Sequence, residues 1–172
     1  MDRMLDQPVC GPVFLRQPEI ARIIVDALHA GQDRFRRYEL HAFVVMSNHV
    51  HVLVTPHVDG TKWLGPLKGF TAHEANRILG RSGRFWQDES YDRLIRDNTE
   101  FQRVLRCIEN NPVAAGMCTS PEEFPWSSAA PGRSPAAGVC PAWAESSWMK
   151  GANRGRLTAT VAKPQGVAAR RS

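Results

Sequence analysis

The stretch that decides the fold is YELHAFVVMSNHVHVLVT, which runs from Tyr38 to Thr55. Both of its halves are rich in valine, phenylalanine and other residues that favour strands. Ser47 and Asn48 stand between the halves and are typical turn residues. The stretch therefore predicts an antiparallel β-hairpin.

Two histidines lie in the second half of this hairpin, His49 and His51, with one residue between them. On a strand they would project from the same face, with their Cα atoms roughly 6.5 to 7 Å apart. Leaving two such rings without partners costs about 1–3 kcal/mol each, so a bound cation or phosphate is one explanation. Two solvated or hydrogen-bonded histidines on an open face are the other, and the pair alone does not decide between them.

Apolar residues at helical spacing predict three helices around the hairpin. They cover Pro18–Gly31, which Gly31 is expected to stop, then Trp63–Gly80, entered near Pro66, then Asn98–Pro112, capped by Asn98 or Thr99 and ended by Pro112. Residues 83–97 are aromatic and alternating enough for a strand or an extended arm. This order predicts an α+β fold, with a small antiparallel sheet and helices packed on one face.

Composition divides the chain into residues 1–130, predicted to form one domain, and residues 131–172, predicted to be a disordered tail. Trp143 and Trp148 are candidate docking points in that tail. From Lys150 onward there are six basic residues and no acids, so residues 1–149 carry 16 basic and 17 acidic side chains. Such a tail attracts polyanions without choosing among them, and a solubilising end explains the same charge equally well.

The chain contains no apolar run of membrane-spanning length and no signal-peptide core near its N-terminus. Its four cysteines never form C-x-x-C, so neither a zinc knuckle nor a disulfide framework is indicated. These features predict a soluble protein of the cytoplasm, with no membrane partner.

Four segments carry a family resemblance: LHAFVVMSNHVHVLV, KGFTAHEANRILGRSGRFWQDESYDRLIRD, IENNPVAAGM and FPWSSA, in this order between about residues 11 and 130. With them the chain resembles the REP-associated tyrosine transposases, which are single-tyrosine HUH transposases. The histidine pair becomes specific because Asn111-Pro112-Val113 and Gly116 follow on the later helix.

The resemblance implies a ferredoxin-like fold and metal-assisted cleavage and rejoining of single-stranded DNA beside hairpins, in DNA transposition. His49 and His51 fall on the family's metal pair, and Asn111 falls on the position of the third ligand. The ion, magnesium or manganese, polarises the scissile phosphate. A tyrosine one turn before the Asn-Pro pair attacks and keeps the DNA through a phosphotyrosine link.

One departure concerns that tyrosine, because Cys107 stands at its position. The two tyrosines of the chain are Tyr38, read as a packing residue, and Tyr91, which is the rival nucleophile. A thiol at Cys107 reaches less far than a phenol, and packing beside the helical stripe is its alternative role. A DNA-nicking enzyme and a non-catalytic, hairpin-binding relic or domesticated module therefore both stay open. An RNA binder is disfavoured because the hairpin lacks exposed aromatic residues.

A second departure is the N-terminus. The family's proteins begin with a strand before the segment matched by CGPVFLRQPEI, whereas only about ten residues precede that segment here. The sheet is therefore expected to lack its first strand, either through a start codon assigned too far downstream or through decay of the gene.

Several other polar and aromatic residues have two interpretations each. His41, His57 and His73 are read as structural. Trp86, with Gln87 beside it, is read as a platform for an unpaired base or as a residue buried beneath the last helix. Six arginines are read as contacts to a DNA backbone or as ion-paired surface groups: Arg81, Arg84, Arg93, Arg96, Arg103 and Arg106.

Overall fold

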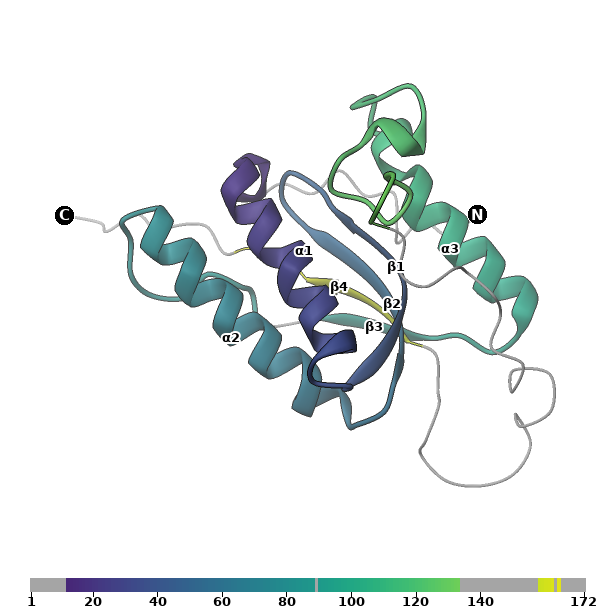
Figure 1. Ribbon diagram of the computed structural model, residues 1–172, viewed down its shortest axis with the longest axis horizontal. Coiled ribbons are helices and arrows are strands. Elements are labelled where there is room, and N and C mark those ends of the chain that lie inside the picture. The colour runs from purple at the N-terminus through teal and green to yellow at the C-terminus, as the bar shows by residue number, and fades with distance from the viewer. Residues whose placement is uncertain (1–11, 89, 134–157, 163, 165–172) are drawn as a thin grey trace.

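The computed structural model describes residues 12–88, 90–133, 158–162 and 164 (Figure 1). Over these residues the chain forms three α-helices and four strands, with two short 3-10 turns. In chain order they are η1 Phe14–Arg16, α1 Pro18–Asp33, β1 Tyr38–Val45, β2 Val50–Pro56, α2 Gly60–Ile78, β3 Tyr91–Leu94, α3 Asn98–Ala114, η2 Pro121–Glu123 and β4 Thr158–Ala162.

The strands form one antiparallel sheet in the order β1-β2-β4-β3. The predicted hairpin is confirmed: β1 pairs with β2 from Tyr38↔Pro56 to Val45↔Val50. The register shifts between Leu40 and Ala42, and this irregularity falls at His41. The α+β class is therefore confirmed, with helices packed against an antiparallel sheet.

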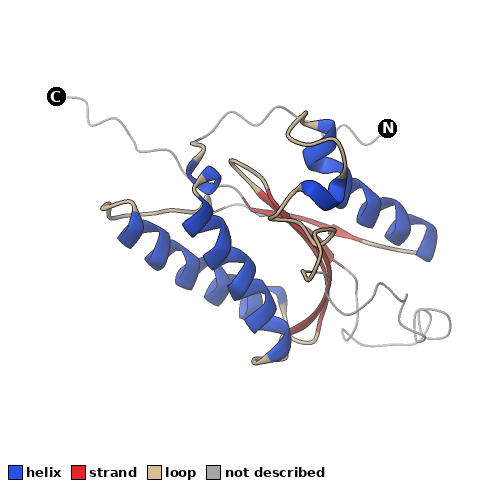
Figure 2. Cartoon of the chain, turned by 45° about the horizontal axis from the view of Figure 1, so that its top comes forward, coloured by secondary structure: helices blue, strands red, loops and turns tan. Residues whose placement is uncertain are grey.

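Helices cover both faces of this sheet, so the prediction that they pack on one face is wrong (Figures 1 and 2). α1 and α2 lie over the face that carries Val50, Val52 and Val54. α3 lies over the opposite face, where Leu53 packs in a second apolar cluster. The physical reason is that alternate residues of the hairpin are apolar on both faces, and each face needs cover.

β4 corrects the prediction of a disordered tail, because Thr158–Ala162 forms an interior strand. It pairs antiparallel with β2 on one side and with β3 on the other. Thr160 and Ala162 are buried there. Residues 134–157, with Trp143 and Trp148, lie outside the described residues, as do 163 and 165–172. The expectation of a missing first strand concerns the chain before Pro12, which also lies outside them.

Of the glycines and prolines predicted to bound helices, Gly80 ends α2 as expected, with φ 60° directly after the C-cap Leu79, whereas Gly31, Pro66 and Pro112 lie inside helices. α1 continues past Gly31 to Asp33, and a Cβ atom at Gly31 would lie 2.1 Å from Tyr38 Oη. Gly31 is thus required for close packing of β1 on α1 rather than for a stop. Pro66 and Pro112 lie inside α2 and α3.

α3 starts from a different cap than predicted. The N-cap is Asp97, whose carboxylate accepts a hydrogen bond from Glu100 N at 2.8 Å, so Asn98 and Thr99 belong to the helix itself. Its stripe of Phe101, Val104 and Ile108 is buried as the sequence predicts.

The segment after η2 closes the outer edge of β1. Trp126 O accepts from Val45 N at 2.9 Å, and Ser128 N donates to Phe43 O at 2.9 Å. These bonds pair backbone groups that an edge strand would otherwise expose. Separately, none of the helices in the described part of the chain has the length and apolar character needed to cross a membrane.

Candidate functional site

The two histidines of the hairpin lie against each other at the start of β2. The centroids of the His49 and His51 rings are 4.6 Å apart and the rings meet edge to face. Both side chains are buried, with exposed fractions of 9% and 3%. The expectation that the pair shares one face of the sheet is therefore confirmed.

α3 brings Asn111 to this pair from sixty positions along the chain. Asn111 Nδ2 lies 3.2 Å from His51 Nε2. A half-turn of the amide group would present Oδ1 to the same place, since the two ends of a carboxamide have nearly the same shape. Three side chains that the sequence singled out as metal ligands thus converge between β2 and α3.

The Asn48 side chain is a hydrogen-bond partner of the His49 ring. Its Oδ1 lies 2.8 Å from His49 Nδ1. With this oxygen as the acceptor, Nδ1 is the donor of the pair, which leaves Nε2 as the nitrogen that could coordinate an ion. A hydrogen bond to the other ring nitrogen is the usual arrangement around a metal-binding histidine.

This donor set fits a divalent ion. Two imidazole nitrogens and one amide oxygen would occupy three coordination positions, and water or phosphate oxygens would complete the shell of magnesium or manganese. Among the described residues, no group of three or more His, Cys, Asp or Glu side chains is placed to hold a metal. A centre here therefore depends on Asn111 as its third ligand.

Cys107 lies on α3 one helical turn before Asn111, and its side chain is exposed. Exposure places it outside the apolar core, on the flank of the helix beside the buried Ile108, so the alternative role beside the helical stripe stays open. Exposure also leaves position 107 accessible from the same flank of the helix as Asn111.

The sheet register places position 91 in the same row as His51. Val161 of β4 pairs with His51 on one side and with Tyr91 on the other. Directly paired positions belong to the same face of a sheet, and neighbouring strands lie about 4.8 Å apart. Positions 51 and 91 therefore share one cross-sheet row, with Cα atoms roughly 10 Å apart.

The other histidines stand apart from this site. His41 is buried beneath α3, where its Nε2 lies 2.7 Å from Thr55 Oγ1 and its ring meets Phe101 edge to face. Burial lowers the pKa of His41 from 6.5 to about 4. His57 is exposed, but its Nδ1 lies 3.2 Å from Arg36 O, so the structural interpretation is confirmed for His41 and His57. His73 is exposed on α2, where its Nε2 lies 3.8 Å from a carboxylate oxygen of Glu74.

The residues predicted to contact DNA fall into three groups: a buried tryptophan, arginines that have a partner, and exposed arginines. Trp86 is buried and donates from Nε1 to Thr71 Oγ1 at 2.9 Å, so it packs beneath α2 and not beneath the last helix. Arg84 forms a close ion pair with Asp88. Arg103 lies 4.0 Å from Glu100, and Arg81 stacks on the Phe14 ring. Arg96 and Arg106 are exposed.

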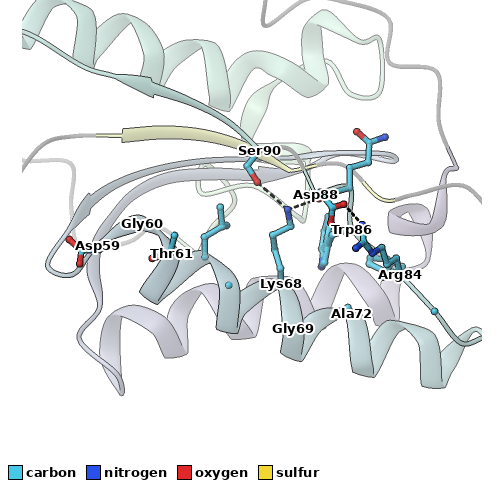
Figure 3. A pocket seen from close by; sticks show the side chains of 15 residues that line it. Asp59, Gly60, Thr61, Lys68, Gly69, Ala72, Arg84, Trp86, Asp88 and Ser90 are labelled. Atoms are coloured by element: carbon cyan, nitrogen blue, oxygen red, sulfur yellow. Dashed lines mark hydrogen bonds and ion pairs between the residues drawn. The ribbon is translucent and has the colours of Figure 1, made fainter.

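An open cleft of about 740 Å³ separates α2 from residues 83–90 (Figure 3). The Lys68 ammonium donates to Gln87 O at 2.6 Å and to Ser90 Oγ at 3.1 Å across this cleft. Gly65 and Gly69 leave space along its α2 wall, since nothing lies within 4 Å of the place that a Cβ atom would take at either residue. Lys68 is thus a basic group in a concave surface, and no sequence motif marks it.

The sequence does not single out two residues of these sites, Asn48 and Lys68, because their roles depend on contacts that no sequence motif indicates. Asn48 was read only as a turn residue, although an amide directly before a metal-type histidine is a usable signal. Lys68 sits on an ordinary helix surface, and no pattern distinguishes it from other lysines. Comparison of the chain with protein-family models, curated proteins and solved structures finds no match.

Proposed function

We propose that this protein binds single-stranded or hairpin DNA and holds a divalent ion, magnesium or manganese, at His49, His51 and Asn111. The proposal includes a ferredoxin-like variant of the α+β fold and membership of the single-tyrosine HUH transposases, acting in the cytoplasm. The observation that carries it is the convergence of the histidine pair of β2 with Asn111 of α3. Two buried imidazoles and a carboxamide that meet at one place supply nitrogen and oxygen donors of the kind that a divalent ion can use.

The residues of this chain would divide the work as follows. His49 and His51 would hold the ion through nitrogen and Asn111 through its amide oxygen, while Asn48 keeps His49 in the required tautomer. The ion, when bound, would withdraw charge from a phosphate oxygen.

A strand-transfer step needs a nucleophile at this phosphate. In the enzymatic form of the proposal, the Tyr91 oxygen forms a new bond to phosphorus, the sugar oxygen leaves with a proton, and the DNA stays attached to the protein. The shared row of positions 51 and 91 favours Tyr91 for this role. The exposed thiol of Cys107, at the tyrosine position of the family pattern, favours the second candidate function, a hairpin-binding protein without nicking activity.

A covalent-adduct assay separates these two functions. Labelled hairpin DNA with a single-stranded flank is incubated with manganese and protein, and adducts are counted after denaturation. The enzymatic form predicts an adduct that disappears in Tyr91→Phe and persists in Tyr38→Phe, since Tyr38 is buried against α1. The binding-only form predicts no adduct from wild type and a metal-dependent one from Cys107→Tyr.

Binding itself is tested in the same series. Anisotropy titrations should show preference for the hairpin over plain duplex in wild type and in both tyrosine variants. Equal affinity for hairpin, single strand and duplex would contradict the proposal. Variants that address the basic tail must spare β4, because Thr158–Ala162 is part of the sheet.

A further inference from the structure

A second cavity lies between α1 and α2, on the face of the sheet opposite α3. Its volume is about 330 Å³. Tyr38 and Trp63 lie in its wall, with ring centroids 5.0 Å apart in an edge-to-face contact. Small and apolar residues make much of the remaining wall: Ala27, Ala30, Gly31, Pro66 and Leu67.

Two exposed aromatic side chains meet at this cavity. Phe35 is 54% exposed and Phe70 is 55% exposed, and both line it. The other large apolar side chains that are exposed in the described residues are aliphatic: Val13, Val58, Leu94 and Met117. Convergence of exposed aromatic rings on a concave apolar surface is typical of an interaction site.

The rim of the cavity is basic. The guanidinium groups of Arg34 and Arg37 stack on the Phe35 ring, 5.5 and 5.3 Å from its centroid. Arg37 Nη1 also donates to Lys62 O at 2.9 Å, which fixes that side chain. No Asp or Glu is among the described residues that line the cavity.

The backbone that presents these groups is strained. Arg36 has φ 47°, and among the described residues it is the non-glycine residue with positive φ. This conformation costs about 1–2 kcal/mol for a side chain with a Cβ atom. Arg36 lies between Phe35 and Arg37, so the strained backbone conformation sets the positions of two residues that shape the rim.

We propose that this cavity docks a peptide segment of a partner protein, one that carries an aromatic or leucine anchor next to aspartate or glutamate. The apolar wall suits the anchor, and the arginines suit the carboxylate in a paired geometry. A nucleobase suits it less well. Tyr38 Oη already donates to Leu28 O at 2.9 Å, so the polar edge of a base would be desolvated with few partners.

This inference does not rest on the proposed DNA function. The cavity lies on the α1 and α2 side, whereas the histidine pair and Asn111 lie beneath α3. Failure of metal or DNA binding would therefore leave it standing, and its own failure would leave the metal centre standing.

The test selects peptides on the full-length protein. A phage library of random twelve-residue peptides is enriched on wild type and counted in parallel on Phe70→Ser and on Arg34→Glu. Two matched controls make the same chemical changes elsewhere: Met117→Ser at another exposed apolar residue, and Arg22→Glu on an exposed position of α1. Thermal melting confirms that each variant is folded.

The expected result is an enriched motif with an aromatic or leucine residue beside Asp or Glu. A synthetic peptide with that motif should bind wild type and both controls alike, and should bind Phe70→Ser and Arg34→Glu at least tenfold more weakly. No motif that depends on the two cavity residues, or a motif without acids, would overturn the proposal.

Two further arms decide between occupants. A labelled twelve-residue oligo-dT that loses affinity in Phe70→Ser and Arg34→Glu, while peptides show no such loss, would assign the cavity to nucleic acid and overturn the proposal. Sedimentation that shows a dimer in wild type and a monomer in Phe70→Ser would assign it to a second copy of the chain, with the same consequence.

Discussion

β2 separates two surfaces that are built from alternate residues of one short strand. Val50, Val52 and Val54 face α1 and α2 and belong to an apolar core of aliphatic and aromatic side chains. His51 and Thr55 face α3 and are held by polar partners, Asn111 and His41. One surface is specified by shape and the other by hydrogen bonding and protonation, so they should respond to different perturbations.

Added side-chain volume should destabilise the apolar side, where α1 packs on β1, and we expect the largest effect from Gly31→Ala. Its Cβ would lie 2.1 Å from Tyr38 Oη, so α1 and β1 must move apart. We expect a loss of about 3 kcal/mol in the free energy of unfolding, at the upper end for overpacking. Urea unfolding monitored by circular dichroism measures it.

The matched control is Gly69→Ala on α2, where nothing lies within 4 Å of the new Cβ. It should gain about 0.5–1 kcal/mol from helix propensity. Similar stability of the two variants would mean that α1 does not pack on β1 as described.

Acid should weaken the α3 side through His41. The pKa of this buried ring is lowered from 6.5 to about 4, so the unfolded chain binds the proton more readily. The stability from its neutral form is present above pH 6.5 and is lost as pH falls toward 4. Linkage gives a loss of about 2 kcal/mol between pH 7 and pH 5.

His41→Gln should flatten this pH dependence, since glutamine does not titrate and retains a group that can bond Thr55 Oγ1. Denaturant midpoints at pH 7, 6 and 5 compare the two proteins. A wild-type slope unchanged in the variant would show that another group carries the acid sensitivity.

β4 joins the two sides, because its residues face both helical layers. Val161→Pro removes a backbone N–H from an interior strand, whereas Val161→Ala keeps it. We expect the proline variant to be 1 to 2 kcal/mol less stable than the alanine variant, roughly the value of one ladder hydrogen bond plus an unpaired group. Hydrogen exchange should report faster amides in β2 and β3. Equal protection of these amides in both variants would show that β4 does not pair with β2 and β3.

Local patterns in the sequence predicted the parts of the fold that depend on local contacts. The hairpin follows from β-formers around Ser47-Asn48, and the buried face of α3 follows from the spacing of Phe101, Val104 and Ile108. The convergence of His49, His51 and Asn111 was also predictable, because strand alternation and helix position place each on a defined face.

What the sequence did not reveal depends on distant contacts. TATVA has small and β-branched residues but no apolar run, and it becomes a strand only between β2 and β3. Gly31 looks like a helix stop until Tyr38 approaches it. α3 runs through Pro112 to Ala114, two residues beyond the predicted stop.

The stability of the fold should depend little on the three proposed metal ligands. His51→Ala and Asn111→Ala each remove one partner of a buried polar contact, so each should lower the free energy of unfolding by about 1 kcal/mol, at the lower end of the cost of an unsatisfied buried group. This is the smallest effect in the series. It means that loss of metal binding in these variants is separable from loss of the fold.

Calorimetric titration with manganese therefore tests the central claim most directly. His57→Ala is the matched control, since His57 is an exposed histidine just past the end of β2. The account predicts one site in wild type and in His57→Ala, weakened at least tenfold by His51→Ala and by Asn111→Ala. Equal manganese affinity in all four proteins, or no binding by wild type, would contradict it.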